Sequence, residues 1–178
     1  YYFPNDTLPS WLKKWNEIDY RTTKAPNVWN KLLPESAYSY ASNMPADSVG
    51  EARGLGKTFP HPIQNSAAFI TSPWGTNYTL DTAIEVVRNL KMGTDSNPDL
   101  LTVSLSSFDM LGHNFGPYSA EMMDATFRLD RALAKFFGDL KKVLPEGLKD
   151  VVFILTADHG IQINPRHGES LRLPDHIF

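Results

Sequence analysis

Two short apolar runs, at residues 100–105 and 151–156, most constrain what this chain can fold into. The second run reads VVFILT and is almost continuously apolar, which is typical of a strand that is covered on both faces. A helix-like pattern precedes the first run, and another separates the two runs. The order helix, strand, helix, strand predicts an α/β fold with a largely parallel sheet that is flanked by helices.

The helical patterns give approximate boundaries. Thr79 can cap a first helix that Gly93 would end, and Ser119 can cap a long helix that reaches about Val143. The stretch between the first strand and Ser119 is expected to be a turn region. Because the long helix separates the two strands, we expect the strands to be parallel neighbours that it connects by crossing over between them. The apolar positions of this helix step by three and four residues: Met122, Thr126, Leu129, Leu133, Phe136 and Leu140.

The first part of the chain, residues 1–78, is predicted to be a loop-rich, cap-like segment in front of an α/β core at 79–178. Residues 10–18 follow Pro9 and predict a short amphipathic helix. From residue 25 to 74, frequent Pro, Ser, Asn and Gly predict loops. A long stretch of this kind is typical of a segment that covers a functional site.

Composition excludes several classes of function. The net charge of −3 does not favour binding to a nucleic-acid polymer, and no apolar run is long enough to span a bilayer. The absence of cysteine excludes disulfides, thiolate zinc sites and cysteine nucleophiles. No signal peptide is recognised in the sequence, and the oligomeric state is not indicated.

Each predicted strand is followed by one carboxylate and one imidazole. Asp109 and His113 follow the first strand, and Asp158 and His159 follow the second. Neighbouring parallel strands end at the same sheet edge, so the four side chains should lie close together there. Either pair alone also fits an ordinary structure, since Asp-x-x-x-His suits a helix surface and Asp-His-Gly suits a turn. Together they predict a metal site, because Asp and His are zinc ligands and burying them without a cation is costly.

The other polar and aromatic candidates are expected to be structural. His61, His167 and His176 are predicted to be surface residues. The four tryptophans are expected to pack rather than to bind substrate. Four charged residues of the long helix are expected to form a solvated or ion-paired face: Asp124, Arg128, Asp130 and Arg131.

These motifs together resemble the alkaline phosphatase superfamily, and they are most similar to flavobacterial-type bacterial alkaline phosphatases and to the type I phosphodiesterase/nucleotide pyrophosphatase family. The similarity covers nearly the whole chain and is densest at 100–160. The residues that carry it are Ser104 to Asp109, Gly112, His113, Gly116, Pro117, Ser119, Glu121, Asp124, Arg128 to Asp130 and Leu155 to Gly160, with Tyr1, Tyr2, Leu8 to Trp11, Trp15, Asn16, Phe59 to His61, Ser72, Pro73 and Gly75.

The resemblance implies an alkaline phosphatase-like core, of which residues 1–178 would be a part. It also implies two zinc ions, with Asp109 and His113 as ligands of one and Asp158 and His159 as ligands of the other. The family's Thr or Ser nucleophile lies upstream of all the matching positions, so this chain is expected to contain no catalytic nucleophile.

The activity that the resemblance implies is zinc-dependent hydrolysis of small-molecule phosphate monoesters through a covalent phospho-Thr or phospho-Ser intermediate, in the intact protein. Phosphodiester or nucleotide pyrophosphate hydrolysis is the nearest alternative. A catalytically incomplete metal-binding fragment and a purely structural α/β domain are the others. The 178 residues alone are expected to be inactive, and the family suggests a periplasmic or secreted location.

Overall fold

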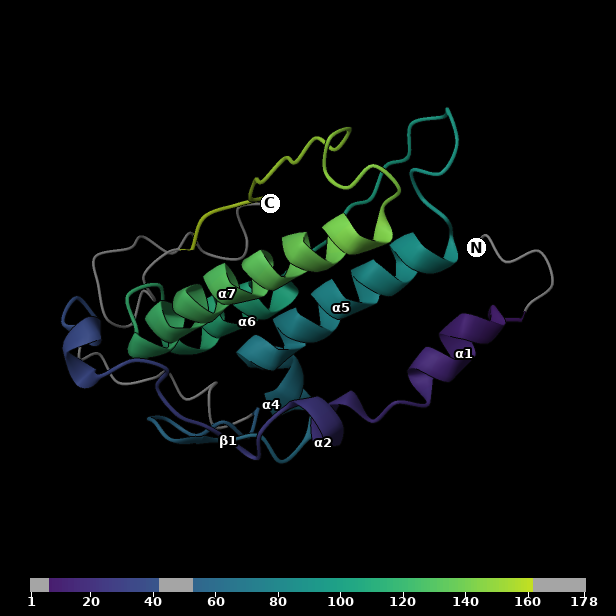
Figure 1. Cartoon of the computed structure of the whole chain (residues 1–178). Coiled ribbons are helices and arrows are strands. Elements are labelled where there is room, and N and C mark those ends of the chain that lie inside the picture. Colours follow the sequence, from purple (N-terminus) through teal and green to yellow (C-terminus); the bar gives the residue numbers. More distant parts are fainter. Residues whose placement is uncertain (1–6, 42–52, 162–178) are drawn as a thin grey trace, which may run out of the picture.

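The computed structural model describes residues 7–41 and 53–161, and in this part of the chain it is mainly helical (Figure 1). The elements are α1 (Ser10–Asn16), α2 (Tyr20–Lys24), β1 (Val28–Trp29), the 3-10 helix η1 (Glu35–Tyr38), β2 (His61–Pro62), α4 (Ser66–Thr71), α5 (Pro73–Asn89), α6 (Ser106–Phe115) and α7 (Ala120–Val143). No described helix is both long enough and apolar enough to cross a membrane.

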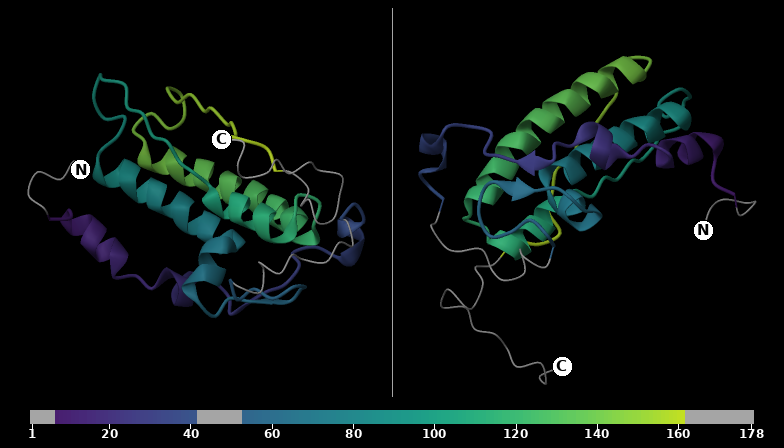
Figure 2. Two further views of the ribbon diagram at one scale, coloured as in Figure 1. Left: turned by 180° about the vertical axis from the view of Figure 1, so that it is seen from behind. Right: turned by 90° about the horizontal axis from the view of Figure 1, so that it is seen from below.

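Helices α5 and α7 lie side by side and form the long axis of the molecule (Figures 1 and 2). The prediction for α7 is confirmed: Ser119 caps the helix by accepting a hydrogen bond from the backbone N–H of Met122, and the helix ends at Val143. The predicted start of α5 is wrong. Ser72 caps this helix and Pro73 occupies its first turn, whereas Thr79 lies inside it and donates to the Gly75 carbonyl.

The two long helices enclose one apolar cluster near their C-terminal ends, and residues 101–105 pack against it. The buried members of this cluster are Leu80, Ala83, Ile84, Val87, Phe136 and Leu140. These positions repeat every three or four residues along both helices, as one buried helical face requires.

A second apolar cluster joins the N-terminal segment to α4, α6 and the first half of α7. Trp29 is fully buried at its centre, and Trp15 and Trp74 pack around it, in agreement with the packing role predicted for them. The N-terminal segment runs along α5 (Figure 2), where the Trp15 indole N–H donates to Thr82. Strands β1 and β2 pair antiparallel and bring Trp29 opposite His61.

The loops predicted for residues 25–74 are only partly confirmed. The short helix α1 is present within the predicted 10–18 range, but α4 and the start of α5 fall inside the stretch that was expected to be loop. The division into a cap-like segment at 1–78 and a core at 79–178 stays a prediction. Residues 167 and 176, where two histidines were expected at the surface, lie outside the described residues.

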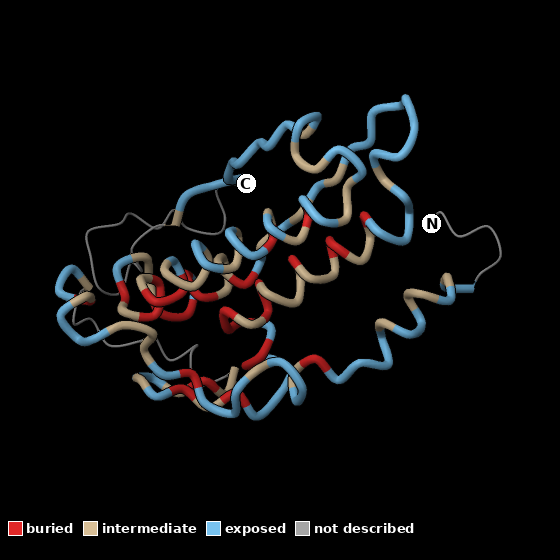
Figure 3. The backbone as a smooth tube through the Cα atoms, viewed as in Figure 1, coloured by how far each residue is buried: buried red, intermediate tan, exposed pale blue. Residues whose placement is uncertain are grey.

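Residues 100–105 and 151–156 are not hydrogen-bonded strands in this structure, so their assignment as neighbouring parallel strands is wrong here. The sheet that the described residues form has two antiparallel strands, and a largely parallel sheet is not confirmed. The first run nevertheless has one face that packs on the helices and one that is exposed. Leu101, Val103 and Leu105 pack on the helices, whereas Leu100 is 87% exposed. In the second run, Val152 and Ile154 are 85% exposed. The tube of Figure 3 is pale blue, the colour of exposed residues, along most of the segment that leads to the C-terminal end of the described chain.

The physical reason is that a strand exists only when a neighbour completes its ladder of backbone hydrogen bonds. The apolar pattern of a run fixes which faces can be buried, but it does not supply that neighbour.

The charged face predicted on α7 also needs a correction. Asp130 and Arg131 are exposed, and Arg128 forms an ion pair with Asp124 at 2.6 Å, as predicted, but Asp124 is fully buried. Its carboxylate accepts hydrogen bonds from the Trp29 indole, the Leu32 backbone N–H, the Tyr38 hydroxyl and the Arg128 guanidinium. This single carboxylate therefore fastens the N-terminal segment to α7.

Candidate metal centre

Helix α6 presents the first pair of candidate ligands. The segment predicted to be a turn region is helical from Ser106 to Phe115, because Leu111 and Phe115, one turn apart, are both buried against the second cluster. Asp109 and His113 are also one turn apart and lie on one face, so that Nε2 of His113 is 3.2 Å from Oδ1 of Asp109. The two side chains are therefore neighbours on one face of α6, and their role as ligands of one metal ion stays a prediction.

The second pair lies on an extended, exposed segment beside α6. Asp158 accepts a hydrogen bond from the His159 backbone N–H, and Nδ1 of His159 lies 3.0 Å from the carbonyl oxygen of Gly160. A carbonyl can only accept, so Nδ1 carries the proton and Nε2 of the neutral ring keeps its lone pair. This hydrogen bond therefore selects the tautomer whose Nε2 can bind a metal.

Oδ1 of Asp109 is the point at which the two pairs meet. It lies 3.2 Å from Nε2 of His113 and 3.7 Å from Nε2 of His159, while Nε2 of His159 is also 3.7 Å from Oδ2 of Asp158. The structure thus brings together side chains that are up to 50 residues apart in sequence. We call Asp109, His113, Asp158 and His159 the Asp109 cluster.

The pKa of His159 is raised above its ordinary value of 6.5. The hydrogen bond to the Gly160 carbonyl is the main cause, and the carboxylates of Asp158 and Asp109 add to it. A raised pKa favours the protonated imidazole, which cannot bind a metal. Protons and a cation would therefore compete at this residue.

Glycine at position 112 allows the two halves of the Asp109 cluster to approach each other. A Cβ atom there would lie 2.2 Å from Cδ1 of Ile161, so the missing side chain leaves the space in which Ile161 packs against α6. Ile161 follows His159 by two residues. In the helix, the role of Gly112 is thus to leave room for the Ile161 side chain.

The residues of the Asp109 cluster fit a metal centre in their chemistry, although they do not complete one. Oδ1 of Asp109 is buried and, among the described residues, accepts no hydrogen bond, which leaves its lone pairs available. Within residues 7–41 and 53–161, no group of three or more His, Cys, Asp or Glu side chains surrounds a common point closely enough to hold an ion. The ion-pair distances show that these side chains are neighbours, and they would have to move closer together to share a coordination point.

His61 is the residue that the sequence interpretation misplaced most clearly. It was expected at the surface but is fully buried, with Nδ1 2.9 Å from the Leu55 carbonyl oxygen and Nε2 3.0 Å from the Glu121 carboxylate. Its ring contacts Phe115 in the last turn of α6. Both ring nitrogens are therefore occupied and neither is available as a ligand. The partner that decides this, Glu121, is 60 residues away in sequence, so no local pattern could reveal it.

Comparison with known proteins identifies the family to which the chain belongs. The model of the type I phosphodiesterase / nucleotide pyrophosphatase family matches residues 4–174, and the chain belongs to this family, as its resemblance to the alkaline phosphatase superfamily implied.

Two relatives and one solved structure support this assignment. The chain is 34% identical to alkaline phosphatase PafA of Elizabethkingia meningoseptica over 96% of its own length, and 33% identical to alkaline phosphatase PhoV of Synechococcus elongatus over 86%. The crystal structure of wild-type PafA superposes with a TM-score of 0.69 over 79% of this chain, at 34% identity. This neighbour supports the α/β class.

The chain spans about a third of the length of these relatives: 32% of PafA and 28% of PhoV. In the superposition it likewise covers 28% of the PafA chain.

Proposed function

We propose that the protein hydrolyses phosphate monoesters, with the Asp109 cluster holding part of a two-zinc centre. The observation that carries the proposal is that Oδ1 of Asp109 lies 3.2 Å from Nε2 of His113 and 3.7 Å from Nε2 of His159. Carboxylate oxygen and imidazole nitrogen are typical zinc donors. Bound zinc would lower the pKa of an attacking hydroxyl and stabilise negative charge on the leaving oxygen.

The chain's own residues would act by position and charge. Helix α6 holds Asp109 and His113 on a rigid element, because Ser107, in its first turn, donates to the Ile70 carbonyl at 2.6 Å and the helix packs against α4, α5 and α7. The Gly160 carbonyl keeps Nε2 of His159 unprotonated in the neutral ring. Two carboxylates and two neutral imidazoles offset only part of the charge of two zinc ions, so the site would still attract a phosphate group.

The proposed reaction proceeds through a covalent phospho-Thr or phospho-Ser intermediate, with the nucleophile supplied from outside these 178 residues. The remaining zinc ligands would come from the same source, because a catalytic zinc ion generally needs about three protein ligands. We therefore expect the 178-residue chain alone to show no turnover. A periplasmic or secreted location also belongs to the proposal, and it rests on the family resemblance alone.

The test compares two substrates and two matched substitutions. Purified protein that contains these residues is stripped with a chelator, reloaded with zinc, and assayed with an aryl phosphate and a bis-aryl phosphate. Asp109→Asn should lower kcat/KM by a factor of about 100 or more, because it removes a positioned metal ligand. Asp130→Asn, the same change at an exposed position of α7, should leave it unchanged. Equal losses in the two variants would contradict the proposal.

A preference for the bis-aryl phosphate would favour the second candidate, phosphodiester or nucleotide pyrophosphate hydrolysis, which the family description supports. Zinc binding without turnover of either substrate would identify a metal-binding protein that lacks catalysis. If zinc is not bound at all, the result would favour the remaining alternative, a purely structural α/β domain.

A further inference from the structure

An arginine beside the Asp109 cluster has no role in the proposed reaction. Arg53 is half-buried, and its Nη1 lies 3.5 Å from Sδ of Met110 in α6. Met110 follows Asp109 directly and precedes His113 by three residues. Side chains three residues apart on a helix are neighbours, so the contact with Met110 places the guanidinium next to the first ligand pair.

The order of side chains around α6 shows on which side of the Asp109 cluster Arg53 lies. At about 100° per residue, the first ligand pair occupies the shorter arc of the helix between Met110 and Gly112. Ile161 packs at Gly112, so the segment of the second ligand pair borders one edge of this arc. Arg53 contacts Met110 and therefore borders the opposite edge. The first ligand pair thus has the second pair on one side and a guanidinium on the other.

The hydrogen bond that Arg53 makes in the structure is weak. A thioether sulfur is a poor acceptor, and the same sulfur also lies 3.8 Å from the Thr71 hydroxyl. Among the residues that the structure describes, no carboxylate pairs with Arg53. A guanidinium forms stronger, charge-assisted hydrogen bonds with an oxyanion, so an anionic ligand would displace the sulfur.

The backbone next to Arg53 is fixed by the residues that follow it. Gly54 has a φ of +82°, and a Cβ atom there would lie 2.4 Å from Nδ2 of Asn65, so this position requires glycine. Leu55 is fully buried, and its carbonyl accepts a hydrogen bond from Nδ1 of His61 at 2.9 Å. A side chain on an anchored backbone loses less entropy on binding than one on a free loop.

The position of the guanidinium determines which part of a substrate it can bind. The side chains of His113 and Met110 separate it from Asp109, so it is better placed for a group beyond a metal-bound phosphate than for that phosphate itself. Arginine has N–H donors and no acceptor, so the group must supply acceptors and negative charge. A carboxylate or a second phosphate on the leaving part of the ester has this chemistry, and either can accept two parallel N–H bonds.

We propose that Arg53 is a specificity-determining residue that binds an anionic group, a carboxylate or a phosphate, on the leaving part of the substrate. The preferred substrates are then small phosphate esters whose leaving group carries its own negative charge. This inference rests on the proposed function, because it takes the Asp109 cluster as the place where the scissile phosphate is held.

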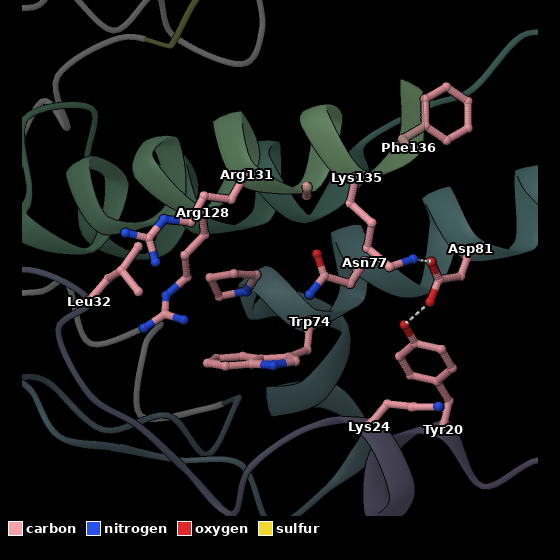
Figure 4. Close-up of a pocket in the computed structure, with 12 residues that line it drawn as sticks. Tyr20, Lys24, Leu32, Trp74, Asn77, Asp81, Arg128, Arg131, Lys135 and Phe136 are labelled. Carbon is pink, nitrogen blue, oxygen red and sulfur yellow. Dashed lines mark hydrogen bonds and ion pairs between the residues drawn. The ribbon is translucent and has the colours of Figure 1, made fainter. Parts of the chain in front are cut away.

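The test is calorimetric titration of zinc-loaded protein that contains these residues with three phosphonates, whose C–P bond is not hydrolysed. Butylphosphonate has no second anionic group, 4-phosphonobutanoate has a carboxylate, and propane-1,3-diphosphonate has a second phosphonate. The variants are Arg53→Gln, which removes the charge, and Arg53→Lys, which keeps it. The control is Arg131→Gln, at an exposed position of α7 in a separate pocket that no member of the Asp109 cluster lines (Figure 4).

We expect the ligands with a second anionic group to bind about tenfold or more tightly than butylphosphonate, because a charge-assisted hydrogen bond contributes roughly that factor. Arg53→Gln should abolish this preference but keep butylphosphonate binding within about twofold, which also shows that the variant is folded. Arg53→Lys should keep part of the preference, and Arg131→Gln all of it. A preference for one of the two ligands alone assigns the group as carboxylate or phosphate.

Two results would overturn the inference and leave the proposed function intact: equal binding of the three phosphonates by the wild type, or a preference that survives in Arg53→Gln. The absence of binding of all three would overturn the inference together with the proposed function, because the Asp109 cluster would then hold no phosphoryl group.

Discussion

Replacing Asp124 by Asn tests whether one buried carboxylate holds the N-terminal segment on α7. The carboxylate has four donors around it, and its oxygens lie 2.6 Å from the Trp29 indole nitrogen, from the Leu32 backbone nitrogen and from Nε of Arg128. The amide would keep the volume but would lose the charge and place an NH₂ group against N–H donors. The perturbation is thus electrostatic, with little change in packing.

The expected loss of stability follows from this arrangement. Breaking a buried ion pair by removing one partner costs about 3–5 kcal/mol, because the remaining charge stays uncompensated. The side chain of Arg128 is 20% exposed, which lowers that cost, while the two opposed donors raise it by about 1 kcal/mol each. We therefore expect the free energy of unfolding to fall by about 4 kcal/mol in Asp124→Asn. Tyr38→Phe, which removes one donor, should cost about 1–2 kcal/mol.

The assay is urea unfolding followed by the fluorescence of the four tryptophans. Asp130→Asn is the matched control, since it makes the same chemical change at an exposed position of the same helix, and it should stay within about 0.5 kcal/mol of the wild type. The reasoning is refuted if Asp124→Asn loses less than about 1 kcal/mol, or no more than the control does.

Three further substitutions test other parts of the structure. Gly75→Ala should destabilise the protein by about 3 kcal/mol in urea unfolding, because the new methyl would lie 2.3 Å from a backbone carbonyl oxygen. Gly138→Ala, with open space around it, should stabilise the protein by about 0.5–1 kcal/mol. A Gly75→Ala variant that is more stable than Gly138→Ala would show that α5 is packed differently. Gly112→Ala should displace Ile161 and weaken zinc binding about tenfold or more with unchanged helicity, as measured by zinc titration and circular dichroism, and an unaltered zinc affinity would count against the proposed approach of the two ligand pairs. Burial, aided by the neighbouring carboxylate of Asp81, raises the pKa of Tyr20 above its ordinary value of 10.0. The contribution of Tyr20 to stability is therefore complete below pH 10 and is lost as the pH rises further. Urea midpoints between about pH 9 and 11 should fall more steeply in the wild type than in Tyr20→Phe, and parallel curves would show that Tyr20 is not responsible.

The helices could be predicted from the sequence where capping and periodicity agreed. Ser119 and the repeat that follows it fixed α7 within one residue at each end. The start of α5 was misplaced because Thr79 resembles a cap, although Ser72 followed by Pro73 is the stronger signal. Helix α6 was missed because glycine and polar residues interrupt its apolar pattern, and its contacts with α4, α5 and α7 cannot be read from its own residues.

The remaining errors concern contacts that no local pattern contains. Residues 100–105 were expected to be a strand, and one face of this segment does pack on the helices, but a strand also needs a hydrogen-bonded neighbour. The burial of His61 depends on Glu121, and the burial of Asp124 depends on four donors, three of which lie at least 86 residues away. The closeness of Asp109 to His159 was predicted from two adjoining strand ends, whereas in this structure Ile161 packs against α6 at Gly112 in the space between them.

The two halves of the Asp109 cluster lie on elements of unequal local stability. Amide hydrogens in α6 are protected by helical hydrogen bonds and a packed face, while residues 152–160 are exposed and form no regular secondary structure. In hydrogen exchange, α6 should therefore exchange slowly, and the amides near His159 should exchange at close to the rate of an unstructured peptide. Any ligand that joins the two halves would appear as new protection at residues 157–160 with little change in α6. The hydrogen-exchange rate of residues 157–160 would thus show whether the two halves of the Asp109 cluster are held together.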